Sequence, residues 1–245
     1  MGKINYSTYS GVKRRLLEIF RSENFPNNKL PSEAELSSRL GVSLVTLRES
    51  LLMLAMEGFI TKKHGSGNYV HPSALDPKMR IDLVNSFSEM LEQSGYKAEY
   101  IPMGHYIEKA DDKVAAKLGI KVGDEVFTAI WHYIADSKLA IVAYNRIPVK
   151  LIQKDLPKDN FPIINLDDFL WEYCHQETSH ALSGYSPLLC NERLAKLFGI
   201  GLPAAILVWK QVFYSVADEK LSYNEVYFNP EIGELITLRN RYFRE

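Results

Sequence analysis

The residues best suited to bind a ligand lie between positions 30 and 70, and the chemistry they offer is hydrogen bonding and charge neutralisation. Arg48 lies in a segment with a helical repeat of leucines, and an arginine side chain can pair with O6 and N7 of guanine. The basic residues at 62–64 can neutralise backbone phosphates. These side chains suit recognition of a nucleic acid, provided that the surrounding elements present them on one surface.

Two short helices are predicted around Arg48. Ser32, followed three residues later by Glu35, forms the signature of a capping box, which predicts that a helix begins there. This helix runs roughly over residues 33–40 and ends at a glycine, a residue that favours the left-handed conformation of a C-terminal cap. Ser43 caps a second helix, whose apolar positions recur at i, i+4 and i+7: Leu47, Leu51 and Leu54. Two helices joined by a short glycine-containing turn predict a helix-turn-helix.

A basic hairpin is predicted after the second helix, which ends at Gly58. Residues 59–61 and 68–70 favour strands. Gly65 and Gly67 between them can adopt the positive φ that a tight hairpin requires. A basic hairpin that follows a recognition helix can lie along a DNA backbone or reach the minor groove, so we interpret it as a wing.

Residues 30–70 resemble the winged-helix domain of the GntR family of bacterial transcriptional regulators. The matching positions follow the order of that family: Leu30-Pro31-Ser32-Glu33, Leu36, Leu40-Gly41-Val42-Ser43, Thr46, Arg48, Leu52, Leu54, Gly58 and Gly65-x-Gly67. Two positions depart from it, because Ala34 and Leu44 stand where the family usually has arginines. Leu44 can offer an apolar contact, for example to a thymine methyl group.

The resemblance implies a DNA-contacting set that combines the helix starts with the wing. Its members are Ser32, Ser43, Leu44, Thr46, Arg48, Lys62, Lys63, His64, Gly65 and Gly67. Serine and threonine bond phosphates more often than bases, so several members would position the protein, whereas Arg48 would read sequence. We expect an operator unlike the commonest ones of the family. The alternatives are a winged helix that serves only as a protein–protein module and a DNA-binding domain weakened by the two lost arginines.

Length and charge predict two domains. A chain of 245 residues can bury two separate cores. Residues 1–71 contain ten Lys+Arg against six Asp+Glu, whereas the remainder contains nineteen against twenty-four. A basic first part suits a nucleic-acid reader joined to a part that does not touch DNA. We expect a DNA-binding domain at 1–71, a proline-containing linker at 72–79 and an effector-binding and dimerisation domain at 80–245.

The sequence offers little support for a membrane segment, a metal site or a cofactor. It has no apolar run of about 18 residues and no signal-peptide core at its start, so we expect a cytoplasmic protein. Cys174 and Cys190 lack metal-type spacing. His175 and His180 flank Glu177 without matching a zinc pattern. We therefore expect no cofactor, no metal and no catalytic residues.

The second part of the chain is predicted to mix strands with short helices. Residues 80–94 read as an amphipathic helix. Two hairpins, over 125–147 and 208–228, alternate with short helical segments at 112–118, 167–174 and 192–197. This pattern predicts an α+β domain with an antiparallel sheet. We expect no internal repeat.

The order of these elements over residues 90–243 looks like the UTRA domain, the effector-binding domain of the HutC branch of GntR regulators, whose fold is similar to that of chorismate lyase. The best matching points are Asp124-Glu125-Val126, Ala135-Asp136 and Arg193-Leu194-Ala195. The resemblance implies an α+β protein in which an N-terminal winged helix-turn-helix precedes an antiparallel-sheet UTRA domain.

The resemblance also points to candidate effector-binding residues. Members that respond to sugar phosphates carry two arginines on the first strand of the central hairpin, where this chain has Trp131 and Tyr133. An uncharged side chain cannot replace bidentate Arg–phosphate pairing, so we expect a neutral sugar or another uncharged metabolite. Trp131 and Tyr133 share a strand face. The candidate polar partners are Asn145, Ser183, Tyr185, Tyr223 and Glu225. For each residue the alternative is ordinary packing in the sheet.

The sequence thus predicts a one-component transcriptional regulator of a metabolic or transport operon. We expect a repressor that binds a pseudo-palindromic site on double-stranded DNA as a homodimer, with a small-molecule effector that shifts the affinity for DNA. The helix at 80–94 would transmit the change. The alternative is a ligand-binding protein or lyase-like enzyme with a weakened DNA-binding domain.

Overall fold

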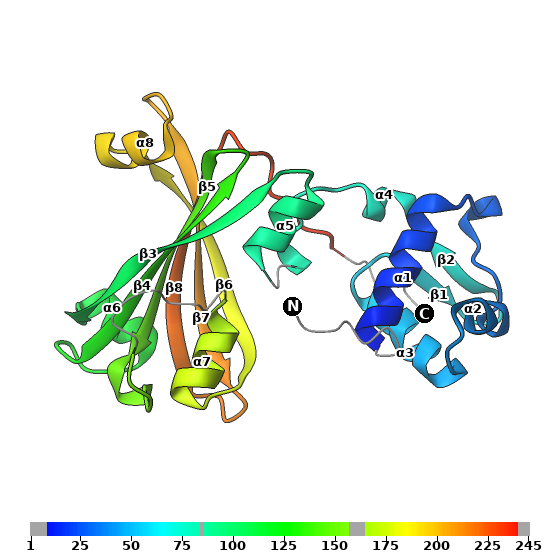
Figure 1. Cartoon of the computed structure of the whole chain (residues 1–245), viewed down its shortest axis with the longest axis horizontal. Coiled ribbons are helices and arrows are strands. Elements are labelled where there is room, and N and C mark those ends of the chain that lie inside the picture. Colours follow the sequence, from blue (N-terminus) through cyan, green and yellow to red (C-terminus); the bar gives the residue numbers. More distant parts are fainter. Residues whose placement is uncertain (1–8, 84–85, 157–164, 240–245) are drawn as a thin grey trace. The chain divides into compact units, whose positions relative to one another are not determined.

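The computed structural model describes residues 9–83, 86–156 and 165–239, which fall into two compact units (Figure 1). Unit 1 comprises Met1–Val84 and Leu235–Glu245, and unit 2 comprises Asn85–Glu234. Each unit has buried hydrophobic clusters of its own. In the described ranges, no helix is both long enough and apolar enough to cross a membrane.

Unit 1 is a winged helix-turn-helix, as predicted. Ser32 caps the second helix by accepting a hydrogen bond from the backbone N–H of Glu35, and Ser43 caps the third by accepting one from Thr46. Beyond the third helix, two short antiparallel strands form the predicted wing. The elements in order are α1 (Tyr9–Ser22), a 3-10 turn (Pro26–Asn28), α2 (Glu33–Leu40), α3 (Leu44–Met56), β1 (Ile60–Lys63), β2 (Gly67–Val70), α4 (Pro72–Leu75) and a second 3-10 turn (Ile81–Leu83).

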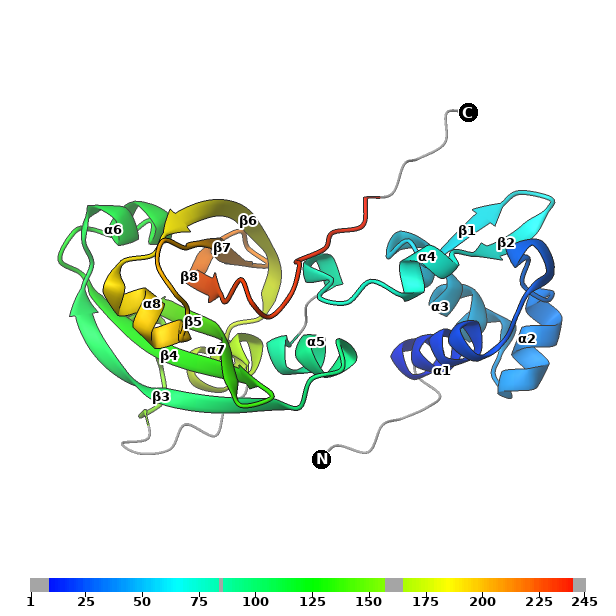
Figure 2. The ribbon, with the colours of Figure 1, turned by 90° about the horizontal axis from the view of Figure 1, so that it is seen from above.

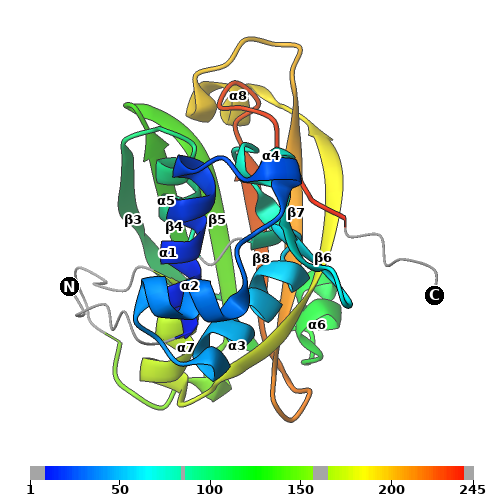
Figure 3. The same ribbon diagram turned by 90° about the vertical axis from the view of Figure 1, so that its right-hand side faces the viewer.

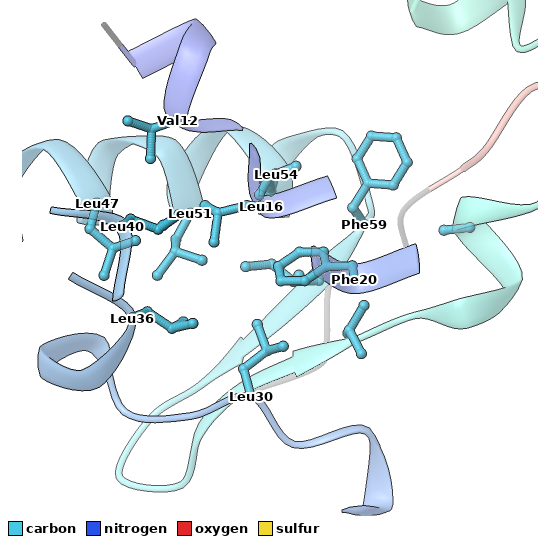
Figure 4. Close-up of a cluster of buried hydrophobic side chains, with 13 residues drawn as sticks. Val12, Leu16, Phe20, Leu30, Leu36, Leu40, Leu47, Leu51, Leu54 and Phe59 are labelled. Carbon is cyan, nitrogen blue, oxygen red and sulfur yellow. The ribbon is translucent and has the colours of Figure 1, made fainter. Parts of the chain in front are cut away.

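The helices α1, α2 and α3 pack around one apolar core (Figures 3 and 4). The side chains that fill it come from the three helices and from the start of the wing, and all are at most 5% exposed: Val12, Leu16, Phe20, Leu36, Leu40, Leu47, Leu51, Leu54 and Phe59. Burying one such side chain contributes roughly 1.5–3 kcal/mol. The predicted leucine repeat of α3 therefore anchors the helix that carries Arg48 on its exposed surface.

The end of the chain returns to complete unit 1. The backbone N–H of Ile236 donates to the carbonyl of Met79 at 3.0 Å, and the carbonyl of Ile236 accepts from the N–H of Ile81 at 2.9 Å. Leu238 packs on the helical core. Arg80, only 7% exposed, donates to the backbone carbonyl of the residue that caps α3, at 3.0 Å. Unit 1 is therefore built from two separate stretches of the sequence.

The predicted helix over residues 80–94 is wrong. The chain instead forms the short turn Ile81–Leu83, and α5 (Phe87–Gln93) begins only after Ser86, which accepts a hydrogen bond from the backbone of α5. Because the backbone on both sides of Arg80 pairs with Ile236, it cannot make the hydrogen bonds of a helix there. Positions 84 and 85 of the predicted helix lie outside the described residues.

Unit 2 is built on a six-stranded antiparallel sheet with the strand order β3-β4-β5-β8-β7-β6, so β3 and β6 are its edges (Figure 2). The helices α6 and α8 lie near opposite ends of the long strands (Figure 1). After α5, the elements are β3 (Ala98–Lys109), α6 (Asp112–Leu118), β4 (Glu125–Ala135), β5 (Lys138–Pro148), a 3-10 turn (Val149–Leu151), α7 (Leu166–Cys174), β6 (Thr178–Leu189), α8 (Glu192–Phe198), β7 (Ala205–Ser215) and β8 (Lys220–Phe228). The predicted α+β class with an antiparallel sheet is confirmed.

The same order of elements occurs twice in unit 2, as α5-β3-α6-β4-β5 and α7-β6-α8-β7-β8. The two halves meet where β5 pairs with β8 in the middle of the sheet. α6 and α8 start with equivalent side-chain caps, Asp111 and Asn191, and end at Gly119 and Gly199, both at φ 67°. The expectation that the chain has no internal repeat is therefore wrong.

The two faces of the sheet are covered by different helices. α6 packs against Val126 and Tyr223, and α8 packs against Val142, which places both helices on one face, here called the α6/α8 face. Phe87 of α5 contacts Tyr133 with its ring centroid 5.2 Å away. Phe169 of α7 stacks on Phe127 of β4, with ring centroids 5.2 Å apart. Since both of these contacts involve the opposite side of β4, α5 and α7 cover the second face, here called the α5/α7 face.

Candidate functional site

The residues predicted to contact DNA lie at the start of α2, at the start of α3 and on the wing. Arg48 and Leu44 are exposed on α3, with Leu44 41% exposed although it is apolar. The predicted wing residues Lys62, Lys63 and His64 are exposed as well. The structure thus presents these side chains to solvent on the winged helix-turn-helix, and their contacts with DNA stay a prediction.

The two capping serines also have a hydroxyl proton to donate. The Ser32 oxygen accepts from the backbone of α2, at 3.2 Å, and the Ser43 oxygen accepts from the N–H of Thr46, at 3.1 Å. The hydroxyls of Ser43 and Thr46 also lie 2.9 Å apart. A serine oxygen that accepts from a helix start can still donate to a phosphate oxygen, and the helix N-terminus favours an anion there. This geometry is consistent with the predicted phosphate-positioning role of these residues.

Glu33 contacts two members of the predicted set. Its Oε2 accepts a hydrogen bond from Nε of Arg48 at 2.7 Å, and its Oε1 lies 3.7 Å from Nζ of Lys62. The hydrogen bond from Arg48 lowers the pKa of Glu33, and so does the charge of Lys62, against the raising effect of partial burial. Glu33 therefore stays ionised beside the predicted reading residues. Sequence reasoning placed it in the family pattern and gave it no role.

The wing needs glycine at its tip for backbone reasons. Gly65 has φ 68° and Gly67 has φ 108°, and a side chain at either position would be strained in these conformations. A Cβ atom added at Gly65 would meet no atom within 4 Å. Backbone conformation and not space therefore selects glycine at position 65, where the chain turns back immediately after the basic residues.

The predicted effector residues do not all lie on one face of the sheet. Asn145 is paired in register with Asn224, and Tyr144 with Glu225, so neighbouring residues of each strand alternate between the faces. By this register, five of the predicted residues lie on the α5/α7 face: Trp131, Tyr133, Asn145, Ser183 and Tyr185. The other two, Tyr223 and Glu225, lie on the α6/α8 face. The structure thus divides the predicted set between opposite faces.

On the α5/α7 face, two adjacent rows of side chains cross the sheet. The amide row, read strand by strand from β3 to β6, is His105, Ala129, Asn145, Asn224, Gln211 and Ser183. The aromatic row beside it is Pro102, Trp131, Ala143, Val226, Trp209 and Tyr185. Neither row contains Lys, Arg, Asp or Glu. The two rows offer hydrogen bonds and ring faces without formal charge, apart from the titratable imidazole at the β3 edge.

Two buried polar atoms in these rows have no partner among the described residues: Oδ1 of Asn224 and Nε1 of Trp209. An amide or indole left without a hydrogen bond in the interior costs about 1–3 kcal/mol, so such atoms point to an additional partner. Sequence reasoning missed Asn224, Trp209 and Gln211. The alignment of Gln211 with Ser183 comes from the pairing of β7 with β6, and no short stretch of sequence specifies that register.

Part of the predicted effector set is buried and packs against neighbouring rings. Tyr133 is 3% exposed and its ring contacts Phe87 of α5 and Tyr100 of β3. Burial raises the pKa of Tyr133. Trp131 is 4% exposed and contacts the same tyrosine of β3 at 6.0 Å. Tyr185, in contrast, is 46% exposed and stacks on the indole of the neighbouring strand at 5.6 Å.

Glu225 belongs to a charged network on the α6/α8 face. It accepts hydrogen bonds from Nη1 of Arg146 at 3.0 Å and from Nζ of Lys113 at 2.6 Å. Arg146 also lies 3.4 Å from Glu108, which accepts a hydrogen bond from Thr128 at 2.6 Å. Burial raises the pKa of Glu225, but Lys113, Arg146 and the Tyr223 hydroxyl together lower it, so that the net shift is downward. These groups satisfy one another across five elements, α6, β3, β4, β5 and β8.

The histidines considered for a metal site do not gather. His180 stacks on Tyr214 with ring centroids 4.9 Å apart and lies 3.5 Å from Asp218. His175 instead ends α7 in the left-handed conformation. Within the described ranges, no group of three or more His, Cys, Asp or Glu side chains is arranged to hold a metal ion.

Comparison with known families identifies both parts of the chain. The family described as bacterial regulatory proteins, gntR family, matches residues 8–70, and the UTRA domain matches residues 69–232. The protein therefore belongs to the GntR regulators. More narrowly, it belongs to the HutC-type members, in which a UTRA domain follows the helix-turn-helix domain.

The relatives are transcriptional regulators of bacteria. The chain is 36% identical over 98 residues to the uncharacterized HTH-type transcriptional regulator YurK of Bacillus subtilis, a match that spans 39% of each chain. It is 25% identical over 239 residues to MngR of Escherichia coli, the mannosyl-D-glycerate transport/metabolism system repressor, spanning 91% of this chain and 92% of MngR. The histidine utilization repressor of Pseudomonas aeruginosa is 28% identical over 147 residues, which is 58% of this chain and 56% of that protein.

Solved structures show the same fold. The possible transcriptional regulator YydK of Bacillus subtilis superposes with a TM-score of 0.73 at 17% identity, covering 95% of this chain and 99% of YydK. PhnF of Mycobacterium smegmatis superposes with a TM-score of 0.59 at 18% identity, covering 94% and 100%. These similarities support the winged helix followed by the six-stranded unit.

Proposed function

We propose that the protein is an effector-responsive repressor that binds a pseudo-palindromic DNA site as a homodimer. The observation that carries the proposal is the exposed set on α3 and the wing, in which Arg48 lies one turn after the capped start of α3 that suits a phosphate. Two of the named relatives are repressors. In a dimer, two recognition helices would enter successive major grooves, and the half-sites would lie about one helical turn apart.

Arg48 and Leu44 define the expected sequence preference. Arg48 would read a guanine, and each bidentate contact of this kind is worth about 1–3 kcal/mol of discrimination. Leu44, apolar and exposed, would contact a thymine methyl group. Each operator half-site is therefore expected to contain a guanine and a thymine within the stretch that faces the start of α3.

The effector would bind on the α5/α7 face, over the amide row. The absence of formally charged side chains from both rows supports an uncharged ligand such as a neutral sugar. The unpartnered Oδ1 of Asn224 could accept a hydrogen bond from a ligand donor, and the unpartnered Nε1 of Trp209 could donate one to a ligand acceptor. Effector binding would change DNA affinity only by its differential affinity for the two states of the protein.

The DNA-binding proposal is tested by selection of genomic fragments. The full-length protein is incubated with sheared DNA of its source organism at moderate salt, and the retained fragments are sequenced. One enriched pseudo-palindrome with guanine and thymine in each half supports the proposal. Weak retention of all fragments, or of none, would contradict it, because a regulator must prefer its site over the competing genome.

The effector proposal is tested with matched variants on opposite faces of the sheet. Neutral and phosphorylated sugars are screened by the release of the operator from the wild-type protein. For the compound that acts, Asn224→Ala is expected to weaken the response by roughly tenfold, since one hydrogen bond to a buried amide is lost. Tyr144→Phe, which removes a hydroxyl from the α6/α8 face, is the control. A response that needs Tyr144 and not Asn224 would indicate an effector site on the α6/α8 face and would contradict the proposal.

A further inference from the structure

Glu33 joins three elements of the DNA-reading unit through one carboxylate. It is the first residue of α2, and it is approached by Arg48 from α3 at 2.7 Å and by Lys62 from β1 at 3.7 Å. Its side chain is 26% exposed, whereas that of Arg48 is 60% exposed. The carboxylate is thus the inner partner, and the guanidinium extends outward from it.

A carboxylate beside a DNA-binding surface is electrostatically unfavourable, because it repels the phosphates that the lysines attract. The ion pairs of Glu33 are largely solvent-exposed, and pairs of this kind contribute little to stability. The helix dipole favours an acid in the first turn of α2, but it favours Glu35 in the same turn as well. What distinguishes Glu33 from Glu35 is its contact with Arg48 and Lys62.

The geometry shows how such a role would work. Glu33 accepts its hydrogen bond from Nε of Arg48, and among the described residues none is hydrogen-bonded to the two Nη atoms. A guanine is read by two parallel N–H donors of one guanidinium edge. With Nε held, the remaining edge, formed by both Nη atoms, is presented in a fixed direction. The long side chain then loses less rotamer freedom when it meets the base.

We propose that Glu33 is a positioning residue for DNA reading, which orients Arg48 toward guanine and ties the wing residue Lys62 to the same point. This inference rests on the proposed DNA-binding function. It goes further by assigning sequence discrimination to an acidic residue that itself touches no DNA.

Charge repulsion and positioning predict opposite results for one substitution. If Glu33 acts only through its charge, Glu33→Gln strengthens binding to every DNA sequence by the same factor. If Glu33 positions Arg48, the same substitution selectively weakens binding to sites with the correct guanine. Glu35→Gln is the matched control, since Glu35 lies in the same first turn of α2, is exposed, and is not within ion-pair distance of Arg48 or Lys62.

The measurement is the affinity of the full-length protein, by fluorescence anisotropy, for two duplexes. One is the selected operator, and the other has the guanine replaced at the position where Arg48→Ala abolishes discrimination. The ratio of the two affinities is expected to fall by about tenfold in Glu33→Gln, toward the value without a bidentate contact. Glu33→Asp, which keeps the charge and shortens the reach, is expected to lower the ratio as well. Glu35→Gln is expected to leave it unchanged.

The possible outcomes distinguish failure of the positioning role of Glu33 from failure of the proposed DNA-binding function. If the wild-type protein shows no preference between the duplexes, the proposed operator reading fails, and the inference with it. If the wild type discriminates and Glu33→Gln keeps the same ratio, the operator reading stands and the positioning role is refuted. Thermal unfolding of each variant confirms that a changed ratio reflects a folded protein.

Discussion

Replacement of Arg146 by methionine is expected to destabilise unit 2 far more than most substitutions of charged residues. Arg146 is 14% exposed, and its partner Glu225 is 8% exposed. Removing the arginine leaves a buried carboxylate with one remaining cation, Lys113, which is 51% exposed. Breaking a buried pair by removing one partner costs about 3–5 kcal/mol. Because Lys113 still neutralises part of the charge, we expect the lower end of this range, about 3 kcal/mol.

Tryptophan fluorescence makes this measurement specific for unit 2, because all three tryptophans of the chain, Trp131, Trp171 and Trp209, lie in it. The free energy of unfolding in urea is taken from the fluorescence transition. With a denaturant slope of roughly 2 kcal/mol per molar, a loss of 3 kcal/mol lowers the urea midpoint by about 1.5 M. Lys113→Met is the control, and it is expected to cost less than about 1 kcal/mol because its ammonium group is half exposed.

Equal effects of the two substitutions would refute this reasoning. They would mean that burial of the Arg146–Glu225 pair does not set its energetic importance. A double variant, Arg146→Met with Glu225→Leu, adds an independent check. Replacing both partners by apolar side chains is expected to restore most of the stability, since no buried charge is then left without a partner.

Three further outcomes are expected. Because the net pKa shift of Glu225 is downward, its stabilising contribution is present at neutral pH and is lost as the pH falls below the usual glutamate range, about pH 4; urea midpoints at two pH values measure this loss, and a flat profile would contradict it. Leu51→Ala, at a fully buried position of unit 1, should cost about 3–5 kcal/mol in the circular dichroism transition while the fluorescence transition stays in place. Burial raises the pKa of Cys174 to about 12 and that of Cys190 less, so iodoacetamide at neutral pH should label Cys190 first by mass spectrometry; equal rates would be unexpected.

The winged helix could be predicted from sequence because its signals are local. The caps at Ser32 and Ser43 and the glycines of the wing each specify a boundary within a few residues. The Glu33–Arg48 pair could not be predicted in the same way. It depends on how α2 packs against α3, which no short segment of sequence specifies.

The sheet was predicted in part, and the features that were missed, β6 and the internal repeat, have physical causes. β6 is an edge strand with exposed residues on both faces, so it lacks the alternation that reveals a half-buried strand. The repeat does leave a signal in the sequence. Residues 135–139 read ADSKL and residues 217–221 read ADEKL, and a proline follows nine residues after the leucine of each motif, at Pro148 and Pro230. A comparison of the chain with itself would have found it.

The candidate effector site shows the same limit. Trp131 and Tyr133 could be placed on one face by their spacing alone. Placing Asn145 and Glu225 on opposite faces of the sheet requires the register between β5 and β8. These strands lie more than seventy positions apart in the chain. Alternation predicts which residues of one strand share a face. It does not predict which of them meet the residues of another strand.

The return of Ile236 to unit 1 has a consequence for how the protein is made. A ribosome synthesises the chain from its N-terminus, and domains generally fold as units during synthesis. All of Asn85–Glu234 is therefore translated before the segment that pairs with the backbone beside Arg80 exists. Unit 1 is thus the first unit whose synthesis begins and the last to receive all of its residues. A nascent chain, or one that stops early, has the winged helix without its final backbone pairing. Unit 1 is therefore completed only after all of unit 2 has been synthesised.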